Sequence, residues 1–151
     1  MSISSRFSVA IHILALLEID KTELNTSENI AMSVNTNPAV IRKITGMLKR
    51  AGLVDVQPGI AGAKLAKDIS EITLLDVYRA VNVVQEDELF SIHDKPNPDC
   101  PVGRNIQDSV EIQFTAAQRA LEKELENRTI KDVVEDILNK EQTHTRDFLK
   151  S

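Results

Sequence analysis

Side chains that can read base edges and attract phosphate lie close together in one stretch of this 151-residue sequence. Amides and hydroxyls hydrogen-bond to base edges, whereas lysine and arginine attract the phosphate backbone. Residues 35–67 hold six cations against the single carboxylate of Asp55. The side chains concerned are Asn35, Thr36, Asn37, Arg42, Lys43, Lys49, Arg50, Lys64 and Lys67. This composition predicts a surface that binds double-stranded DNA.

The charge of the chain supports that interpretation once it is divided along the sequence. The net charge is −5, which alone is unfavourable for binding a nucleic acid. Residues 1–67 carry 8 Lys and Arg against 5 Asp and Glu, whereas residues 68–151 carry 10 against 18. One basic face on an acidic protein suits contact with phosphate through that face. The alternative is a helical bundle whose lysines and arginines merely solvate one side.

Cys100 is the only cysteine and lies between Pro98 and Pro101. Arg104 follows four residues later, and the start of a helix is expected just after it. A nearby cation and a helix N-terminus both favour the reactive thiolate. Two interpretations stay open here: a thiol that responds to an oxidant or electrophile, and a small apolar residue packed beneath a loop.

His93 suggests two further kinds of chemistry with Cys100, and the sequence favours neither. Together with Asp94 these residues could be drawn as a metal site, but their spacing matches no known ligand pattern, so solvated loop residues are favoured. A cysteine nucleophile with His93 as base would need an orienting third group and an oxyanion hole, and no motif supplies them. The sequence therefore predicts neither a metal ion nor an enzyme.

The elements predicted around the basic stretch form a helix pair followed by a hairpin. Residues 3–18 carry an apolar stripe at steps of three and four, which predicts a first helix. Thr26 or Ser27 can cap a short second helix. Asn37 is expected to cap a third helix, because the proline after it lacks only an N–H that would be unpaired there. Gly52 can end that helix in the left-handed conformation.

A glycine-rich hairpin is predicted directly after the helix pair. Residues 53–56 and 64–66 form short strands on either side of a turn that begins at Pro58. Such a hairpin after a helix pair is a wing. The order of helix, short helix, turn, helix and wing, with cations on the last two pieces, favours DNA binding over the helical bundle.

The C-terminal half is predicted to be helices joined by one long loop. Thr73 and Asp76 indicate a capping box that opens a helix. Residues 85–103 lack periodicity and contain three prolines, which predicts a loop. A long helix is expected from Asn105 and a shorter one from Thr129. The long helix carries a narrow apolar seam suited to helix pairing, formed by Ile106, Val110, Phe114, Ala117, Leu121 and Leu125.

Together these elements predict a mainly α fold: a winged helix-turn-helix domain with a two-stranded β wing and a long C-terminal dimerisation helix. The expected divisions are a DNA-binding domain at 1–84, a sensor loop at 85–104, dimerisation helices at 105–140 and a flexible tail at 141–151. Aromatic residues are only 3% and Trp is absent, so the core must be aliphatic, which suits helix packing. With one cysteine and no apolar run near 18 residues, a soluble cytoplasmic protein without a membrane segment is expected.

Several segments, in their order along nearly the whole chain, resemble the Rrf-two family of bacterial winged helix-turn-helix regulators. This family includes the iron-sulfur cluster regulator, the nitric-oxide-sensing repressor and the cysteine metabolism repressor. The resemblance implies a homodimer joined through the long C-terminal helix, two wings on DNA and a sensing loop near Cys100. The matching segments are Ile30-Ala31, the run 48–54, the hairpin 58–63 and the run 72–81.

Residue by residue, the resemblance extends to the base-reading start of the family's recognition helix. The matching positions are Asn37, Ala39 and Arg42. Pro58 replaces the wing arginine of many relatives, so Gln57 or Lys64 is the expected contact with the DNA backbone. Cluster-binding relatives need three cysteines in the loop, and with Cys100 alone an iron–sulfur cluster is not expected.

The sequence as a whole predicts a sequence-specific transcriptional regulator: a homodimeric repressor on a palindromic operator, with an oxidant or small molecule as effector and Cys100 as sensor. A dimeric adaptor that has lost DNA affinity competes with this interpretation, since the chain is acidic and lacks the wing arginine. A small cysteine-dependent enzyme is less favoured. The candidate DNA contacts are Thr26, Asn35, Thr36, Asn37, Ala39, Arg42, Lys43, Lys49, Arg50, Gln57 and Lys64.

Overall fold

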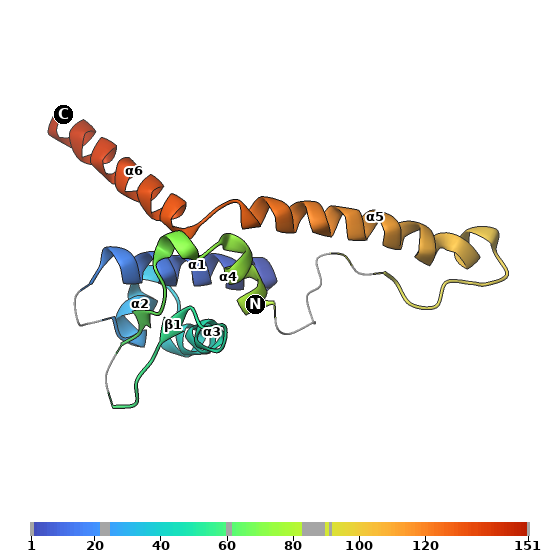
Figure 1. The fold of residues 1–151 in the computed structure, drawn as a ribbon, viewed down its shortest axis with the longest axis horizontal. Helices are drawn as coiled ribbons and strands as arrows, with labels where there is room; N and C mark the ends of the chain where they lie inside the picture. Colours follow the sequence, from blue (N-terminus) through green and yellow to red (C-terminus); the bar gives the residue numbers. More distant parts are fainter. Residues whose placement is uncertain (1, 22–24, 60–61, 83–89, 91, 151) are drawn as a thin grey trace.

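The computed structural model describes residues 2–21, 25–59, 62–82, 90 and 92–150, and helices dominate this part of the chain. The elements are α1 (Ile3–Ile19), α2 (Ser27–Val34), α3 (Pro38–Arg50), β1 (Val54–Asp55), β2 (Lys64–Leu65), the 3₁₀ turn η1 (Ile69–Glu71), α4 (Leu74–Val81), α5 (Pro101–Glu126) and α6 (Ile130–Lys150). Helix α5 runs along one side of the body and α3 lies on the opposite side (Figure 1). The predicted mainly α, winged helix-turn-helix fold is confirmed.

Helix α1 forms the centre of the core. Ala10, Leu14 and Leu17 of the predicted stripe are buried, and Ile13 is buried beside them although it was not part of that stripe. The helix packs against α3, α4 and α6, so it connects the helix pair to the C-terminal helices. None of the helices within the described ranges has the length and apolarity needed to cross a membrane.

Short-range capping bonds set the ends of α2 and α3. Thr26 Oγ1 accepts a hydrogen bond from the N–H of Asn29 at 3.2 Å, and Asn37 Oδ1 accepts one from the N–H of Val40 at 3.0 Å. Asn35 ends α2 with φ of 63°, in the left-handed region that asparagine tolerates better than most residues. The predicted caps are confirmed, and they define a tight turn between the two helices.

The wing is an antiparallel hairpin whose strands are two residues long, shorter than predicted. Asp55 pairs with Lys64 in this register. Gly62 has φ of 94°, and a Cβ added to it would lie 3.0 Å from the carbonyl oxygen of Asn25. Glycine at this position therefore lets the wing approach the chain just before α2.

The predicted capping box of α4 is confirmed. Thr73 Oγ1 accepts from the N–H of Asp76, and the N–H of Thr73 donates to Asp76 Oδ2, both at 3.0 Å. The helix ends at Val81 rather than near residue 84, and residues 83–84 lie outside the described residues. The η1 turn before α4 was not predicted.

Both C-terminal helices are longer than predicted. Helix α5 begins at Pro101, four residues before the expected start at Asn105, because proline is well suited to the first helical position. The end of the predicted sensor loop therefore belongs to α5. Helix α6 continues to Lys150, so residues 141–150 are helical rather than irregular.

The C-terminal part of the apolar seam of α5 pairs with α4 of the same chain. Leu121 and Leu125 pack against Leu75 and Tyr78 of α4. Ala117 is exposed, and Gln118 takes its place in the half-buried row. That row consists of Ile106, Val110, Phe114, Gln118, Leu121 and Leu125. A different face of α5 is therefore available to a partner.

Candidate functional site

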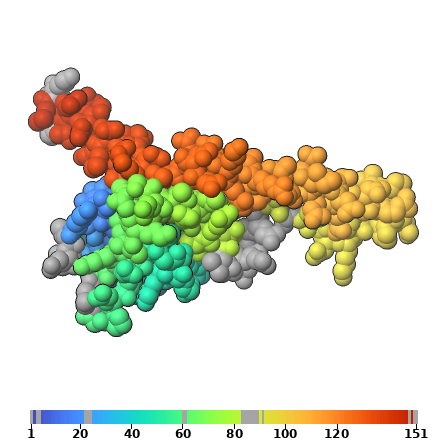
Figure 2. All heavy atoms as spheres, in the orientation of Figure 1, coloured from blue at the N-terminus to red at the C-terminus, as the bar shows by residue number. Residues whose placement is uncertain are grey.

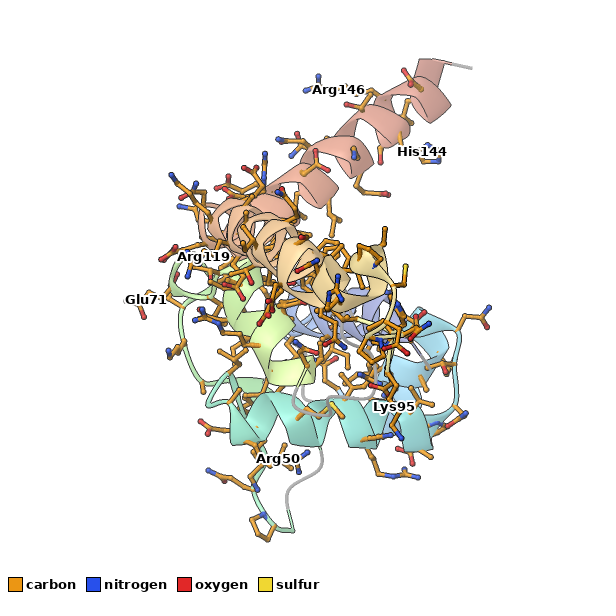
Figure 3. The ribbon with its side chains drawn as sticks, turned by 90° about the vertical axis from the view of Figure 1, so that its right-hand side faces the viewer. Arg50, Glu71, Lys95, Arg119, His144 and Arg146 are labelled. Carbon is orange, nitrogen blue, oxygen red and sulfur yellow. The ribbon has the colours of Figure 1, made fainter. Side chains whose placement is uncertain are left out.

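Helix α3 has one buried and one exposed side. Its buried residues are Ile41, Ile44, Met47 and Leu48. Its exposed residues are Ala39, Arg42, Lys43, Lys49 and Arg50. These five residues together with Gly46 recur at steps of three and four and form one stripe, the outer α3 face. Figure 3 shows Arg50 projecting from α3 on the side away from α5.

Gly46 lies in the middle of the outer α3 face and was not identified from the sequence. A Cβ added to it would meet only Nη1 of Arg50, at 3.8 Å. Packing within the protomer therefore does not require glycine, which costs about 0.5–1 kcal/mol relative to alanine in a helix interior. The absence of a side chain leaves the backbone of α3 open to close approach at this point of the outer α3 face. The available signal was a glycine inside a helix with no turn residue beside it.

Several predicted DNA contacts near the start of α3 also hold the fold together. The capping oxygens of Thr26 and Asn37 already accept backbone hydrogen bonds, so each side chain is fixed in orientation. The Nδ2 group of Asn37 can still donate. Thr36 is half-buried, and its N–H donates to the carbonyl of Ala31 at 3.0 Å. Asn35 is exposed at the turn.

Arg42 connects the two helices only weakly. Its Nη1 lies 3.7 Å from Oε1 of Glu28 on α2, and the two side chains are 59% and 67% exposed. Exposed pairs of this kind contribute at most about 1 kcal/mol. Arg42 can therefore exchange Glu28 for a phosphate or a base at small cost.

The wing supplies one amide and one cation. Gln57 and Lys64 are both exposed, and Lys64 lies opposite Asp55 in the strand pair. Lys67 is exposed just after the second strand. The wing thus carries polar groups suited to the DNA backbone.

Cys100 is exposed and occupies the N-cap position of α5, which excludes the interpretation that it is packed beneath the loop in this protomer. Hydrogen bonds from the backbone N–H groups of Gly103 and Val102 lower the pKa of its thiol. Arg104, the cation that was expected to favour the thiolate, does not contribute to this lowering of the pKa. The helix N-terminus therefore favours the thiolate through its backbone donors.

Gly103 is a second residue that was not identified from the sequence. A Cβ added to it would clash with the carbonyl oxygen of Asn97. Any other residue would push the loop away from α5. Glycine here allows the loop that carries Cys100 to lie against the first turn of the helix.

The metal site considered for the loop is not formed by the described residues. His93, Asp94 and Cys100 are each exposed, and in this part of the chain no three His, Cys, Asp or Glu side chains are grouped closely enough to hold a metal ion. Iron–sulfur clusters are held mainly by several thiolates. A single thiol does not fit such a cluster.

Helix α5 presents an exposed row to solvent, the outer α5 face. The N-terminal part of the helix projects beyond the body (Figure 2). Ile112 is the large apolar residue of this row and is 69% exposed. The small residues Ala116 and Ala120 follow at steps of four, and opposite charges stand at the two ends. The row is Asp108, Ile112, Ala116, Ala120 and Lys123, all exposed.

Comparisons with known proteins agree with this arrangement. A family profile described as "Rrf2: Iron-dependent Transcriptional regulator" matches residues 3–136. YwnA of Bacillus subtilis (strain 168), named provisionally as an HTH-type transcriptional regulator, is 48% identical over 132 residues, which is 87% of this chain and 96% of YwnA.

Solved structures share the fold. One, named provisionally as a DNA-binding protein, has a TM-score of 0.67 and 45% identity over 85% of this chain and 97% of its own. The oxidised form of CymR from Staphylococcus aureus has a TM-score of 0.59 and 23% identity, over 89% of this chain and 97% of CymR. Because the family match covers nearly the whole chain, the protein belongs to the Rrf2 family, whose members are transcriptional regulators and not enzymes.

Proposed function

We propose that this protein is a homodimeric, sequence-specific repressor that binds a palindromic operator through the outer α3 face. The observation that carries the proposal is the polar and basic stripe on α3, opposite four buried residues of the same helix. An α-helix about 10–12 Å wide enters the B-DNA major groove, which is about 12 Å wide. The start of α3 would then meet the base edges.

The candidate side chains divide into three roles in this arrangement. Arg42 and Asn37 are placed to donate to base edges, and Ala39 is suited to the methyl group of thymine. The phosphate contacts come from Lys43, Lys49, Arg50, Gln57 and Lys64. Asn35 and Thr36 position the start of α3, and Thr26 positions the start of α2.

The outer α5 face supports a homodimer. If two copies of α5 cross in antiparallel orientation near Ala116, Asp108 of one copy lies beside Lys123 of the other. Ile112 is then covered by the small residues Ala116 and Ala120. A two-fold dimer presents two α3 helices, so the operator half-sites should lie about one helical turn, 10–10.5 base pairs, or a multiple of it apart.

Replacing Lys49 with alanine tests the mode of binding. We expect DNA affinity to fall about equally on specific and unrelated duplexes, because a phosphate contact carries no sequence information. The slope of log affinity against log salt should become shallower by about 0.9 for each lost phosphate contact. Fluorescence anisotropy with labelled duplexes at several salt concentrations measures both quantities.

The matched control is Lys131→Ala on α6, which removes the same charge far from α3 and should leave the slope unchanged. Arg42→Ala should instead weaken the operator more than unrelated DNA. If the wild-type protein does not bind duplex DNA at low salt, the adaptor alternative is favoured. The net charge of −5 is the reason to test that alternative.

We further propose that Cys100 makes DNA binding sensitive to disulfides and oxidants. The exposed thiolate would attack one sulfur of oxidised glutathione, which forms a mixed disulfide and releases one glutathione thiolate. The adduct adds charge and bulk beside the contact between Gly103 and Asn97. It therefore alters the attachment of the loop to α5, the proposed dimer helix.

Oxidised glutathione is expected to lower the operator affinity of the wild-type protein by about tenfold, a typical coupling between two sites. Cys100→Ser should show no change, because the chain has no other cysteine. Mass spectrometry verifies one adduct per protomer. Alkylation of a cysteine becomes faster as pH rises because the thiolate forms. Since the pKa of Cys100 is lowered, this rise in rate should occur at a lower pH than for a cysteine of pKa 9.0. Full modification without loss of affinity would refute the switch.

The single thiol also supports a regulator that ligates no iron–sulfur cluster through this loop. We infer a cytoplasmic location, because a transcriptional repressor acts where the chromosome is.

A further inference from the structure

A cavity of about 630 Å³ lies between α4 and α5, next to residues 90 and 92. Its size falls within the range of small-molecule sites, about 300–1,000 Å³. It lies on the α5 side of the body, whereas the outer α3 face points the opposite way (Figure 3). The proposed DNA contacts therefore do not use it. Its principal lining side chains are Tyr78, Phe90, Phe114, Glu111, Arg119 and Glu122.

Aromatic rings form a preorganised wall of this cavity. Phe90 and Phe114 stack with centroids 5.3 Å apart, which joins the loop to α5. Tyr78 is held edge-on by Phe7, with centroids 5.6 Å apart. Gln118 Nε2 donates to the hydroxyl of Tyr78 at 3.4 Å. Three rings from separate elements are thus fixed around one space.

The described lining residues carry a net negative charge. Glu111 and Glu122 contribute two carboxylates, whereas Arg119 contributes the only opposing charge among the described lining residues. Glu122 accepts a hydrogen bond from Gln118 at 3.4 Å, and this neutral partner does not cancel its charge. Within the described part of the chain, neither carboxylate forms an ion pair. Rings together with uncompensated carboxylates attract cations, because the face of a ring is electronegative.

We propose that this cavity binds a hydrophobic organic cation, whose apolar body lies against the rings and whose charge lies near Glu111 and Glu122. Glu111, Thr115 and Arg119 line both this cavity and the groove beside Ile112. A bound cation would therefore contact the same ridge of α5 that borders the outer α5 face. The binding site itself does not depend on the proposed DNA function.

Titration calorimetry of the full-length, DNA-free protein tests the site with two probes of matched shape and opposite charge. Tetraphenylphosphonium should bind once per protomer, and tetraphenylborate should bind at least tenfold more weakly. The double variant Glu111→Gln, Glu122→Gln should lower the affinity for the cation at least fivefold. Glu126→Gln, on the same helix but outside the cavity, should leave that affinity unchanged.

Arg119→Gln provides a test that misfolding cannot imitate. Removal of the guanidinium should raise the affinity for tetraphenylphosphonium, since it deletes the charge that opposes the ligand. Two results would overturn the proposal. One is equal affinity for both probes. The other is an unchanged affinity for tetraphenylphosphonium in the double variant Glu111→Gln, Glu122→Gln or in Arg119→Gln. These readouts contain no DNA, so failure to bind the cation and failure to bind an operator are separate results.

Discussion

Replacing Gly46 with alanine is expected to stabilise the protein and yet to weaken operator binding by about tenfold or more. Alanine gains about 0.5–1 kcal/mol over glycine in a helix interior because it restricts the unfolded chain. Nothing in the protomer opposes the change, since the added Cβ meets only Arg50 Nη1, at 3.8 Å. The midpoint of thermal unfolding should therefore rise.

The loss of affinity follows from where Gly46 lies. It leaves a gap between Arg42 and Lys43 on one side and Lys49 and Arg50 on the other. When the outer α3 face enters the groove, this gap lets the helix backbone approach the DNA. A methyl group there would hold the four cations away from their partners, and a tenfold loss corresponds to about 1.4 kcal/mol.

Thermal unfolding and fluorescence anisotropy on the same preparation measure the two effects. Ser8→Ala, an exposed change on α1 that also improves helix propensity, serves as the matched control and should raise stability without altering affinity. Unchanged operator affinity of Gly46→Ala would show that α3 does not approach DNA closely through this face.

Features that depend on neighbouring residues could be predicted from the sequence. Asn37 and Thr73 were identified as caps because their bonds reach only three residues along the chain. The left-handed Gly52 at the end of α3 was predicted on the same local grounds. The cations of the outer α3 face were identified from the composition of residues 35–67, which needs no knowledge of the fold.

Features that depend on distant contacts could not be predicted in this way. Leu121, Leu125 and Phe114 form a seam of ordinary helical spacing, and nothing in that spacing says whether it meets α4 or a second protomer. Likewise, the pKa of Cys100 is lowered by backbone donors that exist only because α5 begins at Pro101. The sequence placed the helix start after Arg104, four residues later than the structure does. Gly46 is informative only when the space around it is known.

Replacing Ile112 with lysine should convert the protein to a monomer and lower its affinity for a palindromic operator by about a hundredfold or more. Ile112 is 69% exposed in the protomer, so its replacement should leave the fold intact. In a two-fold interface every substitution occurs twice, so each dimer would gain two charges where apolar surface should be buried. Burial of an unpaired charge is strongly unfavourable.

The loss of operator affinity follows from linkage between two half-sites. A dimer binds its second half-site at a high effective concentration, which raises affinity by about 10²–10⁴ without new contacts. A monomer keeps the outer α3 face but loses this gain, so Ile112→Lys should bind a single half-site as well as the separated wild-type protomer does.

Sedimentation velocity measures the assembly of the protein, and fluorescence anisotropy measures its binding to DNA. The control is Gln107→Lys, an exposed position outside the outer α5 face. If Ile112→Lys is still a dimer, the interface does not lie on the outer α5 face. If it is a monomer that binds the palindrome with full affinity, dimerisation is not needed for operator binding.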